Sequence, residues 1–214
     1  MSYLFTFLPW IVYALLGGHS AASQQRGTLA AFAVTVLVIV YKRRTGNAFD
    51  ALIIETGSAA FFAAIAAIAF AAPHSGLLTY TAALSNTTLA VIAWASLAVR
   101  RPFTLGIAKQ TMPREAWTHP AFIHANDVIT TLWAGSFTVS AAILMAVIHA
   151  RADVFVLATI QVLGFVVPMV ATARYVKIAH ARAQHGVGNI PPGVPVQPLS
   201  SESMPSRRGQ GLPA

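Results

Sequence analysis

Residues 50–72 read D-A-L-I-I-E-T-G-S-A-A-F-F-A-A-I-A-A-I-A-F-A-A, and this stretch decides the fold class. After Glu55 it holds no charged residue up to position 72. A helix needs about 20 apolar residues to cross a hydrocarbon core of about 30 Å, so the stretch predicts a transmembrane helix. Its many small residues allow another helix to approach closely. We therefore expect one face of this helix to pack against a neighbour, within the protomer or between protomers.

Five further apolar stretches approach or reach a spanning length, at residues 3–18, 22–41, 77–99, 127–149 and 154–176. The sequence therefore predicts an all-α integral membrane bundle of six transmembrane helices, arranged as three hairpins. The first stretch is short and contains Pro9, and the second begins near Gln24, Gln25 and Arg26. A five-helix count, or a first pair that enters the bilayer without crossing it, is the alternative.

The composition agrees with a membrane protein. Only 9% of the residues are charged and 56% are hydrophobic, whereas soluble domains carry about 25% charged residues. Lipid must therefore cover much of the surface. The chain has no cysteine, which excludes disulfides, Cys-ligated zinc, iron–sulfur clusters and thiol catalysis.

The basic residues predict the orientation. Of the 14 Lys and Arg residues, twelve lie at the end of or after the second, fourth and sixth stretches, and only Arg26 and Arg151 lie elsewhere. Because basic loops stay in the cytoplasm, both termini should be cytoplasmic. The net charge of +8 then indicates contact with anionic lipid rather than with nucleic acid. The expected lipid contacts are Arg43, Arg44, Arg100, Arg101 and Lys109.

The chain divides at about residue 182. Residues 1–182 form the predicted bundle, whereas Gly, Pro, Ser and Gln dominate residues 183–214 and no apolar period survives there. Such a composition is typical of disorder. We expect a disordered cytoplasmic tail.

Glu55, Asn86 and Asp127 are the candidate polar sites at membrane depth. Glu55 lies about 7.5 Å along the helix from Asp50, and it predicts either a proton- or cation-binding carboxylate or a structural ion pair with Lys42 or another inner base. Asp50, together with Asn126 and Asp127, is interpreted as opening a helix, where such side chains cap free backbone N–H groups. Asn86 should find a partner across a helix interface.

His19, His74 and His149 follow the first, third and fifth stretches. The topology places all three near the outer face. Three converging histidines bind zinc or copper, or sense external pH, but nothing in the pattern makes them converge. One interfacial histidine on each turn is the favoured interpretation. We expect no metal, no cofactor and no catalytic residue, because the sequence lacks H-E-x-x-H, G-x-S-x-G and a phosphate-binding Gly loop.

The inner loop over residues 100–126 is the most distinctive segment. Basic residues alternate there with apolar ones, and three prolines break it into short pieces. This pattern predicts a segment in the headgroup plane, with aromatics inward and bases on phosphates. The segment resembles the inner loop of bacterial intracellular septation protein A and related multi-pass membrane families. The matching residues are Arg101, Pro102, Phe103, Trp117, Asn126, Trp133 and Phe137.

The resemblance implies a bacterial inner-membrane protein that is linked to envelope growth and division through protein contacts, without known enzymatic chemistry. Those septation proteins commonly have five transmembrane helices, so the six helices predicted here depart from the pattern of that family. The first functional hypothesis is therefore a scaffold or interaction protein of the cell envelope, as a homo-oligomer or with other membrane proteins. The alternative is a small oligomeric transporter or channel that uses Glu55.

Overall fold

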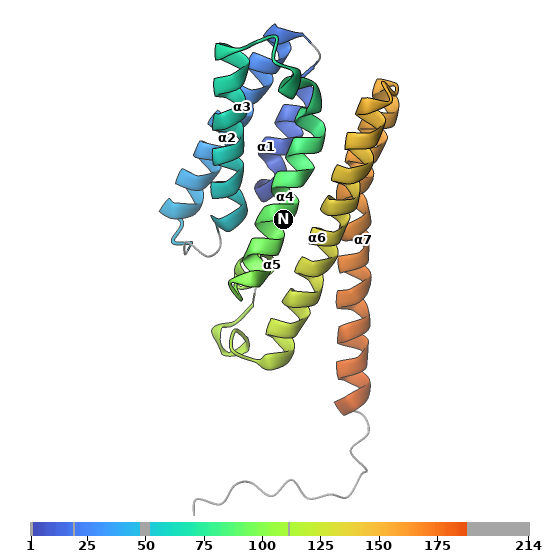
Figure 1. Ribbon diagram of the computed structural model, residues 1–214. Coiled ribbons are helices and arrows are strands. Elements are labelled where there is room, and N and C mark those ends of the chain that lie inside the picture. Colours follow the sequence, from blue (N-terminus) through green and yellow to red (C-terminus); the bar gives the residue numbers. More distant parts are fainter. Residues whose placement is uncertain (1, 19, 48–51, 111, 188–214) are drawn as a thin grey trace, which may run out of the picture. The chain divides into compact units, whose positions relative to one another are not determined.

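A computed structural model of the chain describes residues 2–18, 20–47, 52–110 and 112–187. These ranges are helical and contain no strand, which confirms the predicted all-α class. In chain order the elements are α1 (Ser2–Leu16), α2 (Ala21–Arg44), α3 (Ile53–Ala71), η2 (Gly76–Tyr80), α4 (Thr81–Ala98), α5 (Phe103–Ala108), η3 (Arg114–Ala116), α6 (Pro120–His149) and α7 (Val154–Val187) (Figure 1).

Five segments in the described part of the chain are long and apolar enough to cross a membrane. They are Ala21–Arg44, Ile53–Ala71, Gly76–Ala98, Pro120–His149 and Val154–Ala179. These helices make the chain a helical membrane protein. The first predicted span, α1, has only 15 residues and is about 22 Å long at 1.5 Å per residue, less than a core of about 30 Å. The six-span count therefore stays a prediction.

Residues Met1–Val176 form one compact unit. Within it the closest helix pairs are α4 with α6, α2 with α3, and α1 with α2. The part of α7 within its candidate span is the least buried, at 11%, against 28–44% for the other four spans. A larger share of α7 than of the other four spans therefore faces away from the bundle.

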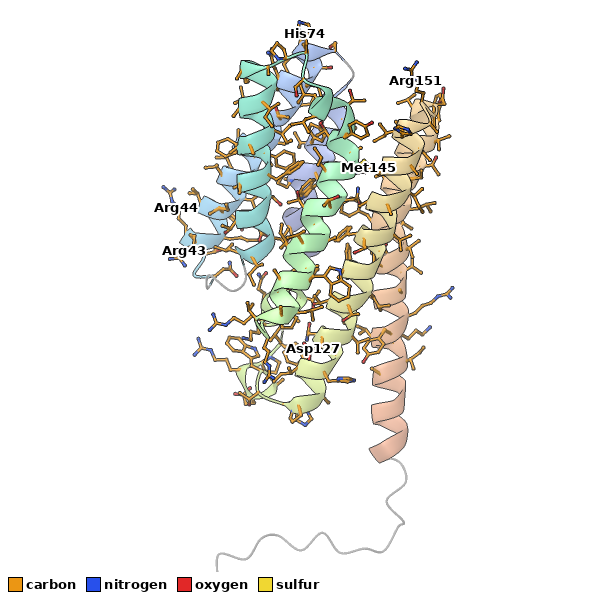
Figure 2. All side chains as sticks on the ribbon, in the orientation of Figure 1. Arg43, Arg44, His74, Asp127, Met145 and Arg151 are labelled. Atoms are coloured by element: carbon orange, nitrogen blue, oxygen red, sulfur yellow. The ribbon has the colours of Figure 1, made fainter. Side chains whose placement is uncertain are left out.

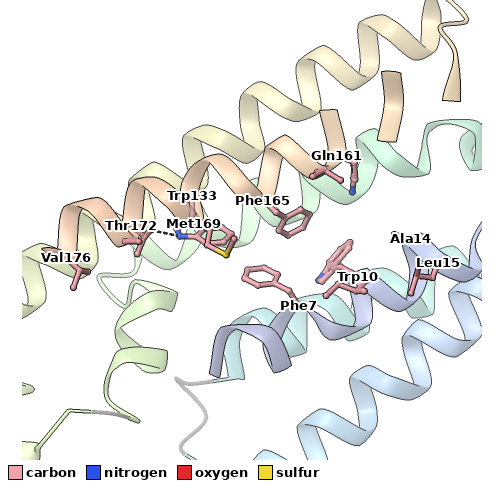
Figure 3. A pocket seen from close by; sticks show the side chains of 13 residues that line it. Phe7, Trp10, Ala14, Leu15, Trp133, Gln161, Phe165, Met169, Thr172 and Val176 are labelled. Carbon is pink, nitrogen blue, oxygen red and sulfur yellow. Dashed lines mark hydrogen bonds between the residues drawn. The ribbon is translucent and has the colours of Figure 1, made fainter. Parts of the chain in front are cut away.

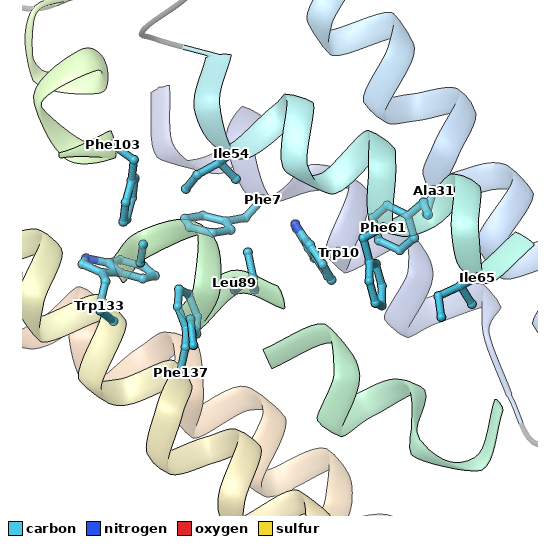
Figure 4. Close-up of a cluster of buried hydrophobic side chains, with 14 of the residues drawn as sticks. Phe7, Trp10, Ala31, Ile54, Phe61, Ile65, Leu89, Phe103, Trp133 and Phe137 are labelled. Carbon is cyan, nitrogen blue, oxygen red and sulfur yellow. The ribbon is translucent and has the colours of Figure 1, made fainter. Parts of the chain in front are cut away.

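Aromatic rings fill the centre of this unit. Phe62 and Phe137 are fully buried, and Trp10 and Trp133 are nearly so. Trp10 lies against both Phe61 and Phe62, with ring centres 5.2 and 4.7 Å apart, and Trp133 lies 5.6 Å from Phe137 (Figure 4). The core thus joins α1, α3 and α6.

The small residues of α3 provide the packing face that the sequence predicts. Ser58 and Ala69 are completely buried, and a side chain at Gly57 would overlap Ile92 of α4. The close neighbours of α3 in this structure are α2 and α4. This part of the small-residue face is therefore used within the protomer.

α6 begins seven residues before the predicted start at 127, so the prediction that Asn126 and Asp127 open this helix is wrong. Its N-cap is His119, whose Nδ1 accepts a hydrogen bond from the backbone N–H of Ala121 at 3.3 Å, and Pro120 occupies the first turn. Proline suits this position because its fixed φ is already helical and its missing N–H would have no partner.

α7 is longer than its predicted range of 154–176 and continues to Val187. Residues 183–187, which the sequence analysis assigns to the tail, are therefore helical. The remainder of that tail, residues 188–214, lies outside the described residues, as does Asp50.

The inner loop is only partly the surface segment that its pattern predicts. α5 buries Phe103 and Ile107 within the bundle core, and the backbone N–H of Phe103 donates to the Ser96 hydroxyl at 3.2 Å. Met112 is exposed. α5 is therefore anchored in the bundle by Phe103 and Ile107, and its first residue is joined to Ser96 near the end of α4.

Candidate functional site

A buried ion pair joins α2 to α3. Glu55 lies in the first turn of α3 and Lys42 in the last turn of α2, and they are 1% and 5% exposed. The ammonium of Lys42 donates to the Glu55 carboxylate and also to the Thr6 hydroxyl, at 2.9 Å to the latter. The ion pair that was one of the two predictions for Glu55 is present, with Lys42 as its partner.

This pair brings three helices together at one place. Thr6 comes from α1 and is itself buried. One turn further along α3, the indole N–H of Trp10 donates to the Ser58 hydroxyl at 3.0 Å. Since the carboxylate is neutralised by a fixed ammonium, the arrangement favours a structural role for Glu55 over ion binding.

A second polar cluster joins α4 to α7. Asn86 is completely buried, and its amide donates to Oε1 of Gln161 at 2.8 Å. The Gln161 amide donates in turn to the Ser85 hydroxyl at 3.4 Å. The predicted interhelical partner of Asn86 therefore exists. The sequence analysis missed Gln161. This residue could have been noticed as a single amide side chain within an apolar stretch, although the sequence does not indicate its partner.

One polar atom in this cluster stays unmatched. The Asn86 carbonyl oxygen Oδ1 has no hydrogen-bond partner among the described residues. A side chain at Gly164 of α7 would lie 3.3 Å from this oxygen and 2.7 Å from the Ser140 hydroxyl. Gly164 therefore permits α7 to come close to α4 and α6 at this level.

Asp127 does not join either cluster. It is half-buried within α6, and no hydrogen bond or ion pair between described residues links it to Glu55 or Asn86. Figure 2 shows it at the opposite end of the bundle from His74 and Arg151. The three predicted polar candidates therefore occupy separate places.

The histidines form no metal site in the described part of the chain, where no three His, Cys, Asp or Glu side chains gather. His74 lies in the turn after α3, and His149 is the last residue of α6. His19 lies outside the described residues.

The five predicted lipid contacts form two groups. Arg43 and Arg44 end α2 (Figure 2). Arg100, Arg101 and Lys109 instead surround one hollow of about 400 Å³, together with Pro102, Leu105 and Gly106. The structure thus brings three of the five bases to one place.

A groove of about 830 Å³ lies between α1 and α7 in the described part of the chain, and Trp133 of α6 is part of its lining. Figure 3 shows Phe7 and Trp10 of α1 facing Phe165 and Met169 of α7. Phe7 stacks on Trp133 with ring centres 5.1 Å apart and meets Phe165 edge-on at 5.3 Å. Sequence reasoning missed this groove, because it depends on how two helices distant in the chain are placed.

The groove is almost wholly apolar. Its polar groups are Gln161 and Thr172, and both already have partners, since Thr172 accepts from the Trp133 indole at 3.1 Å. Its volume lies in the range of about 300–1,000 Å³ that is usual for ligand sites. The groove therefore suits an apolar occupant.

Comparison with protein-family models, curated proteins and solved structures found no match for this chain.

Proposed function

We propose that this chain is a multi-pass protein of the bacterial inner membrane that acts through protein contacts as a scaffold or interaction protein of the cell envelope. In this proposal both termini are cytoplasmic, and the groove between α1 and α7 is the interaction site. The groove is the observation that carries the proposal. The inner-loop resemblance to septation proteins supports the placement in the envelope.

The length of the groove favours a helix as its occupant. Its lining on α7 runs from Gln161 to Val176, which is about 22 Å at 1.5 Å per residue. One leaflet supplies only about 15 Å of hydrocarbon, half of a core of about 30 Å. A lipid chain confined to one leaflet would leave part of the groove unfilled, whereas a helix that crosses the membrane would fill it along its length.

The occupant in this proposal is α7 of a second copy. α7 borders the groove and is the least buried of the long apolar helices. A twofold axis beside α7 would place α7 of each copy in the groove of the other copy. Both subunits would then use the same surface for the interface. The aromatic residues at the base of the groove, Trp10 and Trp133, are of the kind that dominates binding energy at interfaces.

The alternative function, a transporter that uses Glu55, has less support. A coupled carrier needs an ionisable group that can bind and release its ion or proton. Glu55 already has an ammonium partner and is 1% exposed. The scaffold proposal requires no such group.

Single cysteines test the groove directly, because the chain has none of its own. Met169→Cys places a thiol in the groove, and Val167→Cys, two residues along α7 and outside its lining, is the matched control. With a short bismaleimide in native membranes, we expect the Met169→Cys protein to form covalent dimers and the Val167→Cys protein to stay largely monomeric.

Two results would contradict this proposal. Monomers with both variants, or equal dimer formation by both, would exclude the groove as the contact between copies. A Met169→Cys product that joins one copy to a different protein would overturn the second copy as occupant.

A further inference from the structure

We infer that Arg100, Arg101 and Lys109 form a binding site for a phosphate group at the inner end of the bundle. The inference does not depend on the groove, because none of these residues lines it. It rests on how the backbone, the anchored α5 helix and the charges are arranged around the hollow of about 400 Å³.

The backbone places the two arginines side by side after α4. The N–H of Arg101 donates to the Ser96 carbonyl at 2.8 Å, and the N–H of Arg100 donates to the Leu97 carbonyl at 2.9 Å. Arg100 has φ of 56°, the left-handed conformation with which this motif closes a helix. The chain therefore turns sharply here, and both arginines line the hollow.

The third base comes from the far end of α5. Phe103 and Ile107 fix this helix in the core, and Lys109 follows directly after it. The Lys109 ammonium lies 5.5 Å from the centre of the Trp117 ring, which is a cation–π contact. α5 thus brings a third base to the lining that contains the two arginines, and the buried Gly106 belongs to the same lining.

The lining of the hollow carries three basic side chains, so the hollow favours a bound anion. Its lining contains no Asp or Glu, and the described residues provide no carboxylate within ion-pair distance of Arg100 or Arg101. Like charges held close together repel one another, and a bound anion removes that cost. The planar guanidinium group matches phosphate by donating two parallel hydrogen bonds, so two arginines and a lysine suit phosphate chemistry.

The position of the hollow points to a phospholipid headgroup as the source of the phosphate. The apolar span that contains α4 ends at Ala98, two residues before Arg100. The bases therefore lie where the hydrocarbon ends and headgroup phosphates begin. Free phosphate offers the same chemistry, and the experiment separates the two sources.

Arg151 provides a matched control for Arg100. It also has left-handed φ, 54°, after a helix that closes with the same pair of backbone hydrogen bonds. It lines neither hollow. Arg151→Gln therefore removes one charge from the same backbone motif without touching the proposed site.

The experiment measures the melting temperature, Tm, of the full chain in detergent, with phosphatidylcholine, with phosphatidylglycerol or with inorganic phosphate added. Ligands stabilise the folded state by mass action. We expect phosphatidylglycerol to raise Tm by about 5 °C or more at saturation for the wild type and Arg151→Gln. Phosphatidylcholine and inorganic phosphate should have much smaller effects.

The Arg100→Gln/Arg101→Gln variant should lose the response to phosphatidylglycerol while its Tm without lipid stays close to that of the wild type. If it does not fold, Lys109→Gln gives the same test and should reduce the response at least twofold. If inorganic phosphate raised Tm as much as phosphatidylglycerol does, the three bases would still form a phosphate site, but its ligand would be free phosphate rather than a lipid headgroup. A full response in the variants, or an equal loss in Arg151→Gln, would overturn the inference.

Discussion

At the scale of single residues, the Lys42–Glu55 pair is the contact whose disruption we expect to lower the stability of the fold most. Taking two charges out of water is costly, and their attraction in the protein roughly offsets that cost. The intact pair therefore contributes little net stability. Removing one member is different, because the remaining charge stays buried without compensation.

Glu55→Gln should lower the free energy of unfolding by about 3–5 kcal/mol, the usual cost of breaking a buried pair. Thermal unfolding in detergent measures this loss. Glu115→Gln makes the same chemical change at an exposed position of η3 and should leave Tm nearly unchanged. A Glu55→Gln protein as stable as the wild type but defective in ion or proton flux in liposomes would favour the transporter.

At the scale of elements, α7 is attached to the bundle by few polar contacts. One is the amide pair of Asn86 and Gln161, and another is the Ser136 hydroxyl, which donates to the Gly164 carbonyl at 3.1 Å. Hydrogen bonds between membrane helices contribute about 0.6–2 kcal/mol each. Their loss should therefore loosen α7 without unfolding the other helices.

Gln161→Leu should destabilise the protein by about 0.6–2 kcal/mol, because it leaves the buried Asn86 amide without its partner on α7. Adding Asn86→Leu should restore part of the loss, since both polar groups are then absent. Thr159→Val is the control on α7, as Thr159 is exposed and bonds only within its own helix. Additive losses in the double variant, measured by thermal unfolding, would show that the two amides do not interact.

The elements also show how far the sequence could predict the structure. Each predicted span contains a long helix within its described residues, because an apolar stretch in lipid must satisfy its backbone hydrogen bonds internally. The partner of Glu55 could be narrowed down because Lys42 and Glu55 are only 13 residues apart in the sequence. The start of α6 was predicted wrongly because Asn126 and Asp127 resemble helix caps. The helix in fact begins earlier, with His119 as its N-cap and Pro120 as its first residue. No local pattern indicated Gln161 as the partner of Asn86.

At the scale of the whole molecule, the groove lies between the short helix α1 and the sparsely buried helix α7. Neither property marks a site in the sequence, since both helices are simply apolar stretches there. Only their placement on either side of Trp133 creates the hollow. The low burial of α7 leaves its surface available to a second copy in the proposed dimer.

Filling the groove should therefore separate the copies. Ala173 lines it on α7, and Ala173→Trp would occupy the space that the partner's α7 takes in the proposed dimer. Val167→Trp adds the same bulk outside the groove lining. Neither change should unfold the bundle, because both positions are exposed in the single chain.

The most direct measurement is the number of copies per particle, counted by single-molecule photobleaching of fluorescently labelled protein in native membrane fragments. The account predicts two copies for the wild type and for Val167→Trp, and one copy for Ala173→Trp. A wild-type protein with one copy, or an Ala173→Trp protein that stays dimeric, would contradict the groove as the place where two copies meet.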